Sequence, residues 1–360
     1  MKTAVVHDWL TGMRGGEAVL QAMLPHLPEP TIFTLFHRRG AVSPEIEGRP
    51  IRVSWLDRIP FARARYRSFL PLFPRAVESF DLSGFDLVVS SSHCVAKGAV
   101  APPGVPHLCY CHTPVRYAYE HFDAYFPKGA TRFYGFKRRT IERLRAWDLA
   151  TAGRPTRYLA NSSAVAARIR ARYGYHADVC HPPVDVEFFS PDGEPRQDFL
   201  LAVGALVPYK RFELAIDAAE RAKTRLVIVG RGPEEDRLRA RAGRSVEFLG
   251  AVPRERLREL YRTCAFFVQP AEEDFGIAAA EAVASGAPVV AYERGGVTDI
   301  VRDGIDGVLY PEETAEGLRA AVERARSLSF DYTEMRRSAR RFAPERFARE
   351  FARAARELLS

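Results

Sequence analysis

Short apolar runs alternate with stretches of helical periodicity along most of the chain. This alternation is typical of parallel sheets that are covered by helices on both faces. The runs that predict strands in the first half are KTAVVHDW, TIFTLF, IRVSWL, DLVVSSS, HLCYCHT and RYLANSS. In the second half they are DFLLAVGA, RLVIVG, VEFLG, CAFFVQP, PVVAY and GVLY. We therefore predict an α/β protein with two series of strands.

The two series are separated by residues 181–198, HPPVDVEFFSPDGEPRQD, which are rich in Pro and charged residues and follow neither period. We predict a linker there, between a first domain at 1–180 and a second domain at 199–340. Two doubly wound, Rossmann-like domains joined in this way would face a central cleft. Ligands of such sheets bind at the carboxyl ends of the strands.

The last residues, 341–360, have the pattern of a C-terminal helix that is interrupted at Pro344. Phe347 and Phe351 are one turn apart and would share one face of this helix. We expect the helix to cross back toward the first domain.

Composition fits a protein with two separate cores, since 47% of the 360 residues are hydrophobic and 27% are charged. The formal net charge is +8, and the basic surplus lies in residues 1–190, with 25 Lys and Arg against 16 Asp and Glu. No apolar run approaches the roughly 20 residues that cross a bilayer, and the chain begins without a signal-peptide pattern. We expect a cytoplasmic protein.

The five cysteines form no CxxC pair, and their odd number argues against a disulfide framework. Cys109 and Cys111 could bind a metal together with His107 and His112. Their alternating spacing fits a strand better, so we expect buried thiols and no metal site.

The stretch AEEDFGIAAAEAVA places Glu273 and Glu281 on either side of a Phe-Gly step. Phe275 and Gly276 follow a predicted strand and begin a helix, so the N–H groups near Gly276 and Ile277 form a natural anion site. One carboxylate on each side of a phosphate would suit a ligand with hydroxyls at both ends, such as a nucleotide sugar. A solvated acidic loop followed by a surface helix is the alternative.

Two further loops could meet phosphate. Lys210 and Arg211 follow a buried strand and precede a helix, where cations can contact phosphate oxygens, although such residues are often simply exposed. Gly12, Gly15 and Gly16 form a glycine-rich turn after the first strand. This turn matches neither the dinucleotide fingerprint nor the phosphate loop of nucleotide hydrolases, and a plain turn remains an alternative.

A histidine, His112, ends a buried strand in the stretch CYCHTPVRY. It could hydrogen-bond a sugar or assist proton movement. A structural role is the alternative.

Together, the order and spacing of these stretches resemble the retaining glycosyltransferases of family 4 (glycosyl transferases group 1), which have the GT-B fold. The resemblance covers nearly the whole chain, and its most specific part is the E-x7-E element of Glu273 and Glu281. The stretches HDWLTGMRGGE, CHTPVRY and VPYKR are similar to mannosyltransferase-like members that build bacterial surface polysaccharides.

The resemblance implies a role for each matching position. Glu273 would contact the donor hexose, Lys210 would neutralise the diphosphate leaving group, and His112 would meet the donor sugar near the reacting carbon. Glu281 would bind the ribose hydroxyls. The other implied donor-binding positions are Gly15, Gly16, Arg211, Phe275, Gly276 and Ile277, with the nucleobase beside Gly230, Arg231 and Val252.

One position departs from the family pattern. The family commonly has arginine after the glycine of VGxLVPxK, where this chain has Ala205. One cation on the diphosphate is therefore missing, and such a contact can contribute several kcal/mol to a transition state. Arg211 or Arg116 could replace it, or the protein could be slow or inactive.

The implied reaction is a retaining, metal-independent transfer of a hexose, with mannose from GDP-mannose as the first expectation. The leaving phosphate would take the acceptor proton, so no cofactor is expected. The acceptor would be a saccharide or a polyprenyl-linked saccharide. A nucleotide-sugar 2-epimerase and a non-catalytic member that binds a nucleotide sugar or a partner protein are the alternatives.

Two basic segments bear on the location of the protein. Residues 58–77 hold five arginines and no acid among apolar residues, and residues 128–145 are also basic. Such mixtures fit contact with an anionic membrane, here the inner face of the plasma membrane. Solvated helix faces are the alternative. No recognition motif for nucleic acid accompanies the charge.

Overall fold

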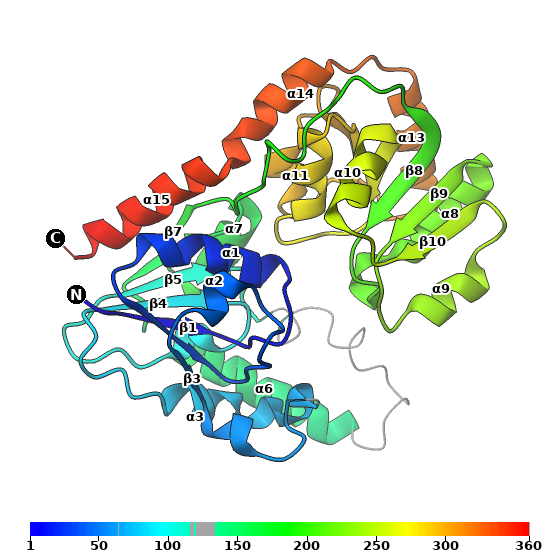
Figure 1. Cartoon of the computed structure of the whole chain (residues 1–360). Coiled ribbons are helices and arrows are strands. Elements are labelled where there is room, and N and C mark those ends of the chain that lie inside the picture. The colour runs from blue at the N-terminus through cyan, green and yellow to red at the C-terminus, as the bar shows by residue number, and fades with distance from the viewer. Residues whose placement is uncertain (64, 116–118, 120–133, 360) are drawn as a thin grey trace. The chain divides into compact units, whose positions relative to one another are not determined.

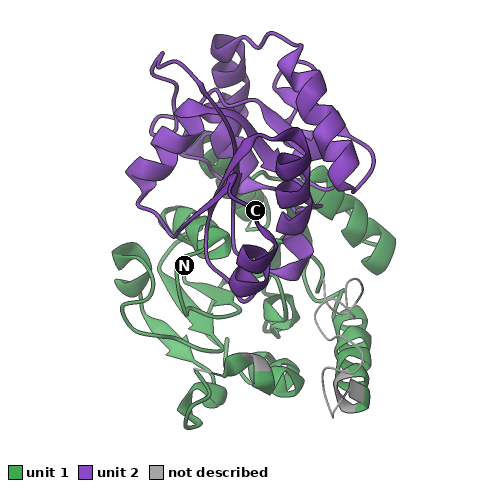
Figure 2. Ribbon diagram, turned by 90° about the vertical axis from the view of Figure 1, so that its right-hand side faces the viewer, with its two compact units in different colours: residues 1–181, 345–360 green, residues 182–344 purple. Residues whose placement is uncertain are grey.

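A computed structural model of the chain describes residues 1–63, 65–115, 119 and 134–359 (Figure 1). The chain divides into two units, which Figure 2 distinguishes by colour. Unit 1 comprises Met1–His181 and Glu345–Ser360, and unit 2 comprises Pro182–Pro344. Each unit contains one fully parallel sheet, which confirms the predicted α/β class with two doubly wound sheets.

The sheet of unit 1 has seven strands in the order β3-β2-β1-β4-β5-β6-β7. The strands are β1 (Thr3–His7), β2 (Pro30–Thr34), β3 (Ile51–Val53), β4 (Leu87–Ser92), β5 (His107–Cys111), β6 (Arg157–Ala160) and β7 (Ala177–Val179). The described helices are α1 (Gly15–Met23), α2 (Pro44–Glu47), α3 (Phe73–Glu78), α6 (Tyr134–Ala150), α7 (Ser163–Tyr173) and α15 (Pro344–Glu357).

Alternating side chains of these strands supply separate cores on the two faces of the sheet. In β1, Val5 packs in the core beneath α1 and α15, whereas Ala4 and Val6 pack in the core beneath α3 and α6. Phe347 and Phe351 of α15 stack at 5.7 Å between ring centroids, which confirms that they share one helix face. The C-terminal helix is therefore part of the core of unit 1.

The sheet of unit 2 has six strands in the order β10-β9-β8-β11-β12-β13. The strands are β8 (Gln197–Val203), β9 (Arg225–Val229), β10 (Val246–Gly250), β11 (Cys264–Gln269), β12 (Val289–Tyr292) and β13 (Gly307–Tyr310). The helices are α8 (Phe212–Ala222), α9 (Glu235–Arg241), α10 (Arg254–Thr263), α11 (Ile277–Ala284), α12 (Val297–Ile300), α13 (Ala315–Arg326) and α14 (Tyr332–Ala339).

Most of the segment at 181–198 lies in unit 2. It has no regular structure until β8 begins, yet Val184, Val186 and Phe189 are buried in the core that includes α10, α11 and α14. Their apolar side chains anchor this stretch because the core removes them from water.

In both sheets the order of strands reverses at one point, between β1 and β4 in unit 1 and between β8 and β11 in unit 2. Open α/β sheets bind ligands outside the carboxyl ends of the strands at such a point. The loops that follow these four strands are therefore where the fold predicts a site.

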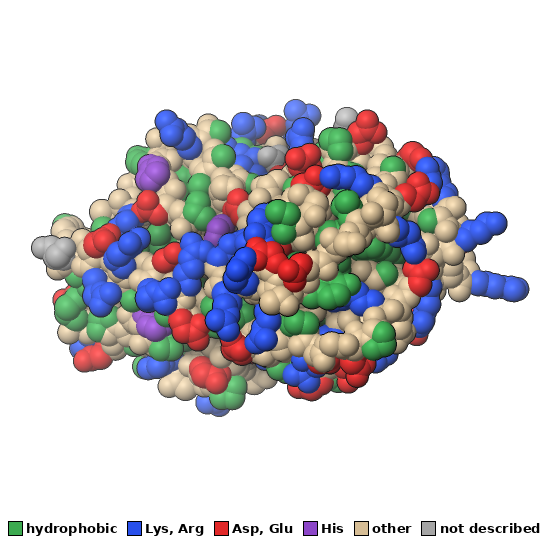
Figure 3. Space-filling view, turned by 90° about the horizontal axis from the view of Figure 1, so that it is seen from above, with side chains coloured by type: hydrophobic (Ala, Val, Ile, Leu, Met, Phe, Trp, Pro, Cys, Tyr) green, Lys and Arg blue, Asp and Glu red, His purple; other side chains and the backbone are tan. Residues whose placement is uncertain are grey.

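The surface carries mixed charge over the face in Figure 3, where Lys and Arg side chains lie among Asp and Glu side chains. Such mixing is typical of a solvated face. Among the described helices, none combines the length and apolar character needed to cross a membrane.

Candidate active site

In unit 2 the loops after β8 and β11 bring Lys210 and Glu273 together. Lys210 ends a short 3-10 helix, Pro208–Lys210, and its Nζ donates a hydrogen bond to Glu273 Oε1 at 2.9 Å. The two side chains are only 15% and 20% exposed. Residues that are 63 positions apart thus form one partly desolvated ion pair at the point where the strand order reverses.

Two glycines allow the backbone to approach closely beneath this pair. Gly204 has φ of 154°, and a Cβ built there would lie 2.6 Å from Lys210 Nζ. Gly230, after β9, has φ of 138°, and a Cβ there would lie 1.8 Å from the carbonyl oxygen of Gly204. A Cβ at Gly230 would displace the backbone of the loop after β8, whereas a Cβ at Gly204 would displace the Lys210 side chain, and both positive φ values favour glycine.

The start of α11 lies beside an unpaired amide. Gly276 is left-handed, with φ of 97° and ψ of 57°, and Ile277 is the first residue of the helix. A Cβ on Gly276 would lie 3.0 Å from Gln269 Oε1. Gln269 is 3% exposed, and neither its Oε1 nor its Nε2 has a hydrogen-bond partner among the described residues.

Buried polar groups are nearly always hydrogen-bonded, so the amide of Gln269 stands out. It lines a small cavity together with Lys210 and Glu273. A cation, a carboxylate, an unpaired amide and a helix N-terminus thus converge within one loop cluster. This combination can bind a phosphate that is attached to a hydroxyl-bearing group.

Further along α11, Glu281 is partly buried and Tyr261 donates its hydroxyl to Glu281 Oε2 at 3.1 Å. Burial raises the pKa of Glu281 to about 7, and the opposing effects of Tyr261 and Arg254 are smaller. When the Glu281 carboxyl group is ionised, both of its oxygens accept hydrogen bonds from hydroxyls.

The remaining predicted donor-binding residues of unit 2 lie in three kinds of surroundings. Arg211 adopts a left-handed conformation, with φ of 52°, and its guanidinium pairs with Glu213 at 2.6 Å and Glu313 at 3.2 Å. Phe275 is buried and packs against Phe342, with 5.4 Å between the ring centroids. Arg231 is exposed, Val252 is half-buried against the core, and Ala205 is exposed.

These placements decide which residue could replace the arginine that the family commonly has at the position of Ala205. Arg211 already contacts two carboxylates, so a substrate phosphate would have to compete with them for this guanidinium. Arg116, the other predicted replacement, lies outside the described residues.

In unit 1 the predicted His112 directly follows β5, and Gly15 and Gly16 form the start of α1 rather than the loop before it. A Cβ on Gly16 would lie 3.9 Å from His112 Nε2, so the first turn of α1 lies against this ring. Burial lowers the pKa of His112 well below its ordinary value, and His93 and His7 nearby lower it further.

Residues that the sequence did not single out surround His112. Ser91 Oγ is 2.9 Å from His112 Nε2 and 3.1 Å from His7 Nδ1. The neighbouring Asp8 is fully buried and accepts hydrogen bonds from the backbone N–H groups of residues 93–96, at 2.7 to 2.9 Å. Asp8 therefore fixes the loop that follows β4.

The five cysteines are buried free thiols. His107 Nε2 is 2.8 Å from Ser90 Oγ, and burial lowers its pKa to about 3. Within the described part of the chain, no group of three or more His, Cys, Asp or Glu side chains could hold a metal ion.

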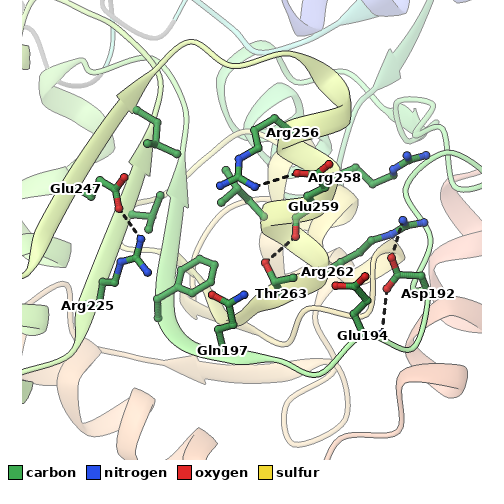
Figure 4. A pocket seen from close by; sticks show the side chains of 14 residues that line it. Asp192, Glu194, Gln197, Arg225, Glu247, Arg256, Arg258, Glu259, Arg262 and Thr263 are labelled. Atoms are coloured by element: carbon green, nitrogen blue, oxygen red, sulfur yellow. Dashed lines mark hydrogen bonds and ion pairs between the residues drawn. The ribbon is translucent and has the colours of Figure 1, made fainter.

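A larger cavity of about 410 Å³ opens at the other edge of the unit 2 sheet (Figure 4). Its lining includes Gln197 and Arg225, the first residues of β8 and β9. Three ion pairs join charged side chains of this lining: Arg225–Glu247, Arg256–Glu259 and Arg262–Asp192. No predicted site residue lines it. The position and the internal pairing separate this cavity from the loop cluster of Lys210 and Glu273.

Two family models match the sequence. Glycosyl transferases group 1 matches residues 185–346, and Glycosyltransferase Family 4 matches residues 13–188. Together they cover nearly the whole chain.

Curated relatives match parts of the chain. A D-inositol 3-phosphate glycosyltransferase of Kribbella flavida is 30% identical in a 228-residue alignment that covers 49% of this chain and 54% of the relative. A GDP-mannose-dependent alpha-mannosyltransferase of Mycobacterium tuberculosis is 38% identical over 124 residues, 34% of this chain and 32% of the relative. The chain thus spans about half the length, or less, of the curated relatives it matches.

Solved structures match over the full length. A sucrose-phosphate synthase from Thermosynechococcus elongatus has a TM-score of 0.73 at 18% identity, with 99% of each chain covered. A lipopolysaccharide outer core galactosyltransferase, WaaB, in its apo form has a TM-score of 0.69 at 16% identity, again with 99% of each chain covered. At these identities the likeness is one of fold.

Proposed function

Because the chain belongs to glycosyltransferase family 4, the family of the glycosyl transferases group 1, we propose that it moves a hexose from a nucleotide sugar to a saccharide acceptor. The observation that carries this proposal is the loop cluster of Lys210, Glu273 and Gln269 beside the start of α11. It supplies contacts for a diphosphate and for an attached sugar at one edge of a parallel sheet.

In the proposed reaction the bond from the sugar to the diphosphate breaks and negative charge grows on the leaving phosphate. Lys210 and the first N–H groups of α11 would stabilise that charge, which is the largest catalytic effect available to this site. Glu273 would orient the hexose hydroxyls and hold Lys210 in place until the donor binds. Retention of configuration and independence of metal belong to this proposal, with the leaving phosphate accepting the proton of the acceptor hydroxyl.

GDP-mannose is the proposed donor and mannose the transferred sugar, supported by the matching stretch of the mycobacterial alpha-mannosyltransferase. The proposed product is a cell-surface polysaccharide or a lipid-linked precursor of one. Ala205 and the paired state of Arg211 favour a second candidate, a family member that binds a nucleotide sugar without transferring it.

A lipid-linked acceptor would place the protein on the inner face of the plasma membrane. Phe61 supports this part of the proposal, because it is 84% exposed and holds a left-handed φ of 62° that strains a bulky residue. Trp55 is 41% exposed, and Arg58 and Arg65 are exposed nearby in sequence. Exposed aromatic and arginine side chains together fit an anionic membrane interface.

The second basic segment adds less to this proposal. Of residues 128–145, those at 128–133 lie outside the described residues, and the others begin α6.

The first experiment is a thermal-shift screen against GDP-, UDP-, ADP- and dTDP-sugars with and without EDTA, since a ligand of the folded state raises its melting temperature. Stabilisation by one nucleotide series, followed by transfer to a saccharide acceptor in EDTA, would support the proposal. Transfer that EDTA abolishes and Mg²⁺ restores would refute metal independence. Product formed without acceptor would indicate an epimerase, and saturable binding without product would favour the binding-only candidate.

A further inference from the structure

His7, Ser91 and His112 lie at the carboxyl ends of three adjacent strands, β1, β4 and β5. His7 and Ser91 are register partners, and His112 follows the strand that pairs with β4 on its other side. The single hydroxyl of Ser91 lies 3.1 Å from His7 Nδ1 and 2.9 Å from His112 Nε2. It therefore bridges the two imidazole rings.

A buried carboxylate lies at the far end of this bridge. His7 is fully buried, and its Nε2 has no hydrogen-bond partner among the described residues. Glu17 Oε1 of α1 lies 3.9 Å from this nitrogen, and Glu17 Oε2 accepts the backbone N–H of Arg14 at 3.0 Å. Burial raises the pKa of Glu17, but His7, a backbone hydrogen bond and His93 together outweigh it and hold the pKa below its ordinary value. Glu17 is therefore a carboxylate at neutral pH.

The two hydrogen bonds that Ser91 makes with His7 and His112 can run in only one direction at a time. A serine hydroxyl donates one hydrogen, and a neutral imidazole carries one N–H and one lone pair. Ser91 therefore donates to one histidine and accepts from the other. When His7 is neutral, the charge of Glu17 favours a proton on His7 Nε2, and His7 Nδ1 then accepts the Ser91 hydroxyl. Ser91 Oγ must then accept the N–H of His112 Nε2.

We propose that Glu17, His7 and Ser91 are positioning residues that fix His112 as the tautomer with its proton on Nε2 and its lone pair on Nδ1. The role rests on the proposed function and on the contact between His112 and the donor sugar that the family resemblance implies. Because burial keeps His112 neutral, the contacts from Glu17 through His7 and Ser91 control the tautomer of His112 and not its charge. His112 would accept a hydrogen bond from a sugar hydroxyl, so the site would discriminate against the sugar that lacks this hydroxyl.

The test compares Ser91→Ala with Ser90→Ala, a matched control. Ser90 is the preceding residue of β4, is equally buried, and bonds His107 Nε2 at 2.8 Å outside this cluster. We expect Ser91→Ala to lower kcat about 10-fold, as expected for one lost neutral hydrogen bond. Affinity for the nucleoside diphosphate and the melting temperature should change no more than in the control.

The direct readout is the side-chain nitrogen NMR spectrum of His112, which distinguishes a protonated from an unprotonated ring nitrogen and needs no substrate. In the wild type Nε2 should carry the proton, and Glu17→Gln and Ser91→Ala should both give a mixture of tautomers. A wild-type His112 protonated on Nδ1, or equal kcat in the two serine variants, would overturn the proposal. If the protein binds no nucleotide sugar, the proposed function is refuted, but the NMR spectrum still tests the tautomer of His112 because it needs no substrate.

Discussion

Replacement of Lys210 by methionine tests the proposed phosphate site most directly, because methionine keeps the aliphatic length and removes the charge. In the unliganded protein the loss is that of one ion pair to Glu273, with both side chains partly exposed. Such a pair contributes at most about 1 kcal/mol to stability. For a unit of this size that corresponds to a fall in Tm of about 2–4 °C.

The effect on the reaction should be much larger. A cation about 4 Å from a phosphate charge gains roughly 4 kcal/mol at an effective dielectric constant of about 20. Loss of one preorganised contact to a developing charge lowers kcat by about 100- to 1000-fold. Lys210→Met should therefore lose most of its turnover and bind a nucleoside diphosphate more weakly, with little change for the nucleoside.

Product formation and calorimetric titration would measure the two quantities. Lys223→Met, at an exposed lysine just after α8, is the matched control for loss of one positive charge in unit 2. Turnover of Lys210→Met within about threefold of the wild type, where a phosphate contact predicts a loss of at least 100-fold, would refute the reasoning.

Three further outcomes follow from the geometry. The pKa of Glu281 is raised to about 7, so its stabilising contribution is full below about 4.5 and is lost as pH rises through 7. Glu281→Gln should therefore have a higher free energy of unfolding than the wild type, by up to about 3 kcal/mol at pH 8, and no such advantage at pH 4. Urea unfolding measures this difference, and equal stability of variant and wild type at both pH values would contradict the prediction. Gly230→Ala places a Cβ 1.8 Å from the Gly204 carbonyl and should lower Tm by roughly 6–12 °C, whereas Gly12→Ala, with nothing within 4 Å of its Cβ, should not. Phe61→Ser should weaken binding to anionic vesicles roughly 10-fold or more in co-sedimentation, and unchanged binding would remove the membrane contact.

The two sheets could be predicted because their central strands are apolar on both faces, which gives continuous hydrophobic runs. The edge strand β7, Ala177–Val179, is short and half-exposed, and no continuous hydrophobic run predicts it. The stretch from 182 to 196 looks like a linker because it lacks a period, although its apolar residues are buried in unit 2. Irregular backbone that packs into a core has no sequence signature of its own.

The candidate site was predictable where a residue type stands out against its neighbours. Lys210 and Glu273 follow apolar strands, and their order in the chain matches a known family. Gln269 and His7 end apolar strands, and Ser91 is the last residue but one of β4, where a polar residue could equally begin a loop. Their roles depend on partners from other strands, and such partners meet only through the strand order and register of the sheet.

The packing of α15 into unit 1 also sets an order of events during synthesis. Phe347 and Phe351 close the apolar face beneath α1, yet they leave the ribosome only after the whole of unit 2. Unit 2 can therefore complete its core while unit 1 still exposes an apolar strip. A nascent chain that stalls or is cleaved after α14 would keep a folded second half attached to an unsealed first half, which makes it a substrate for chaperones and proteases.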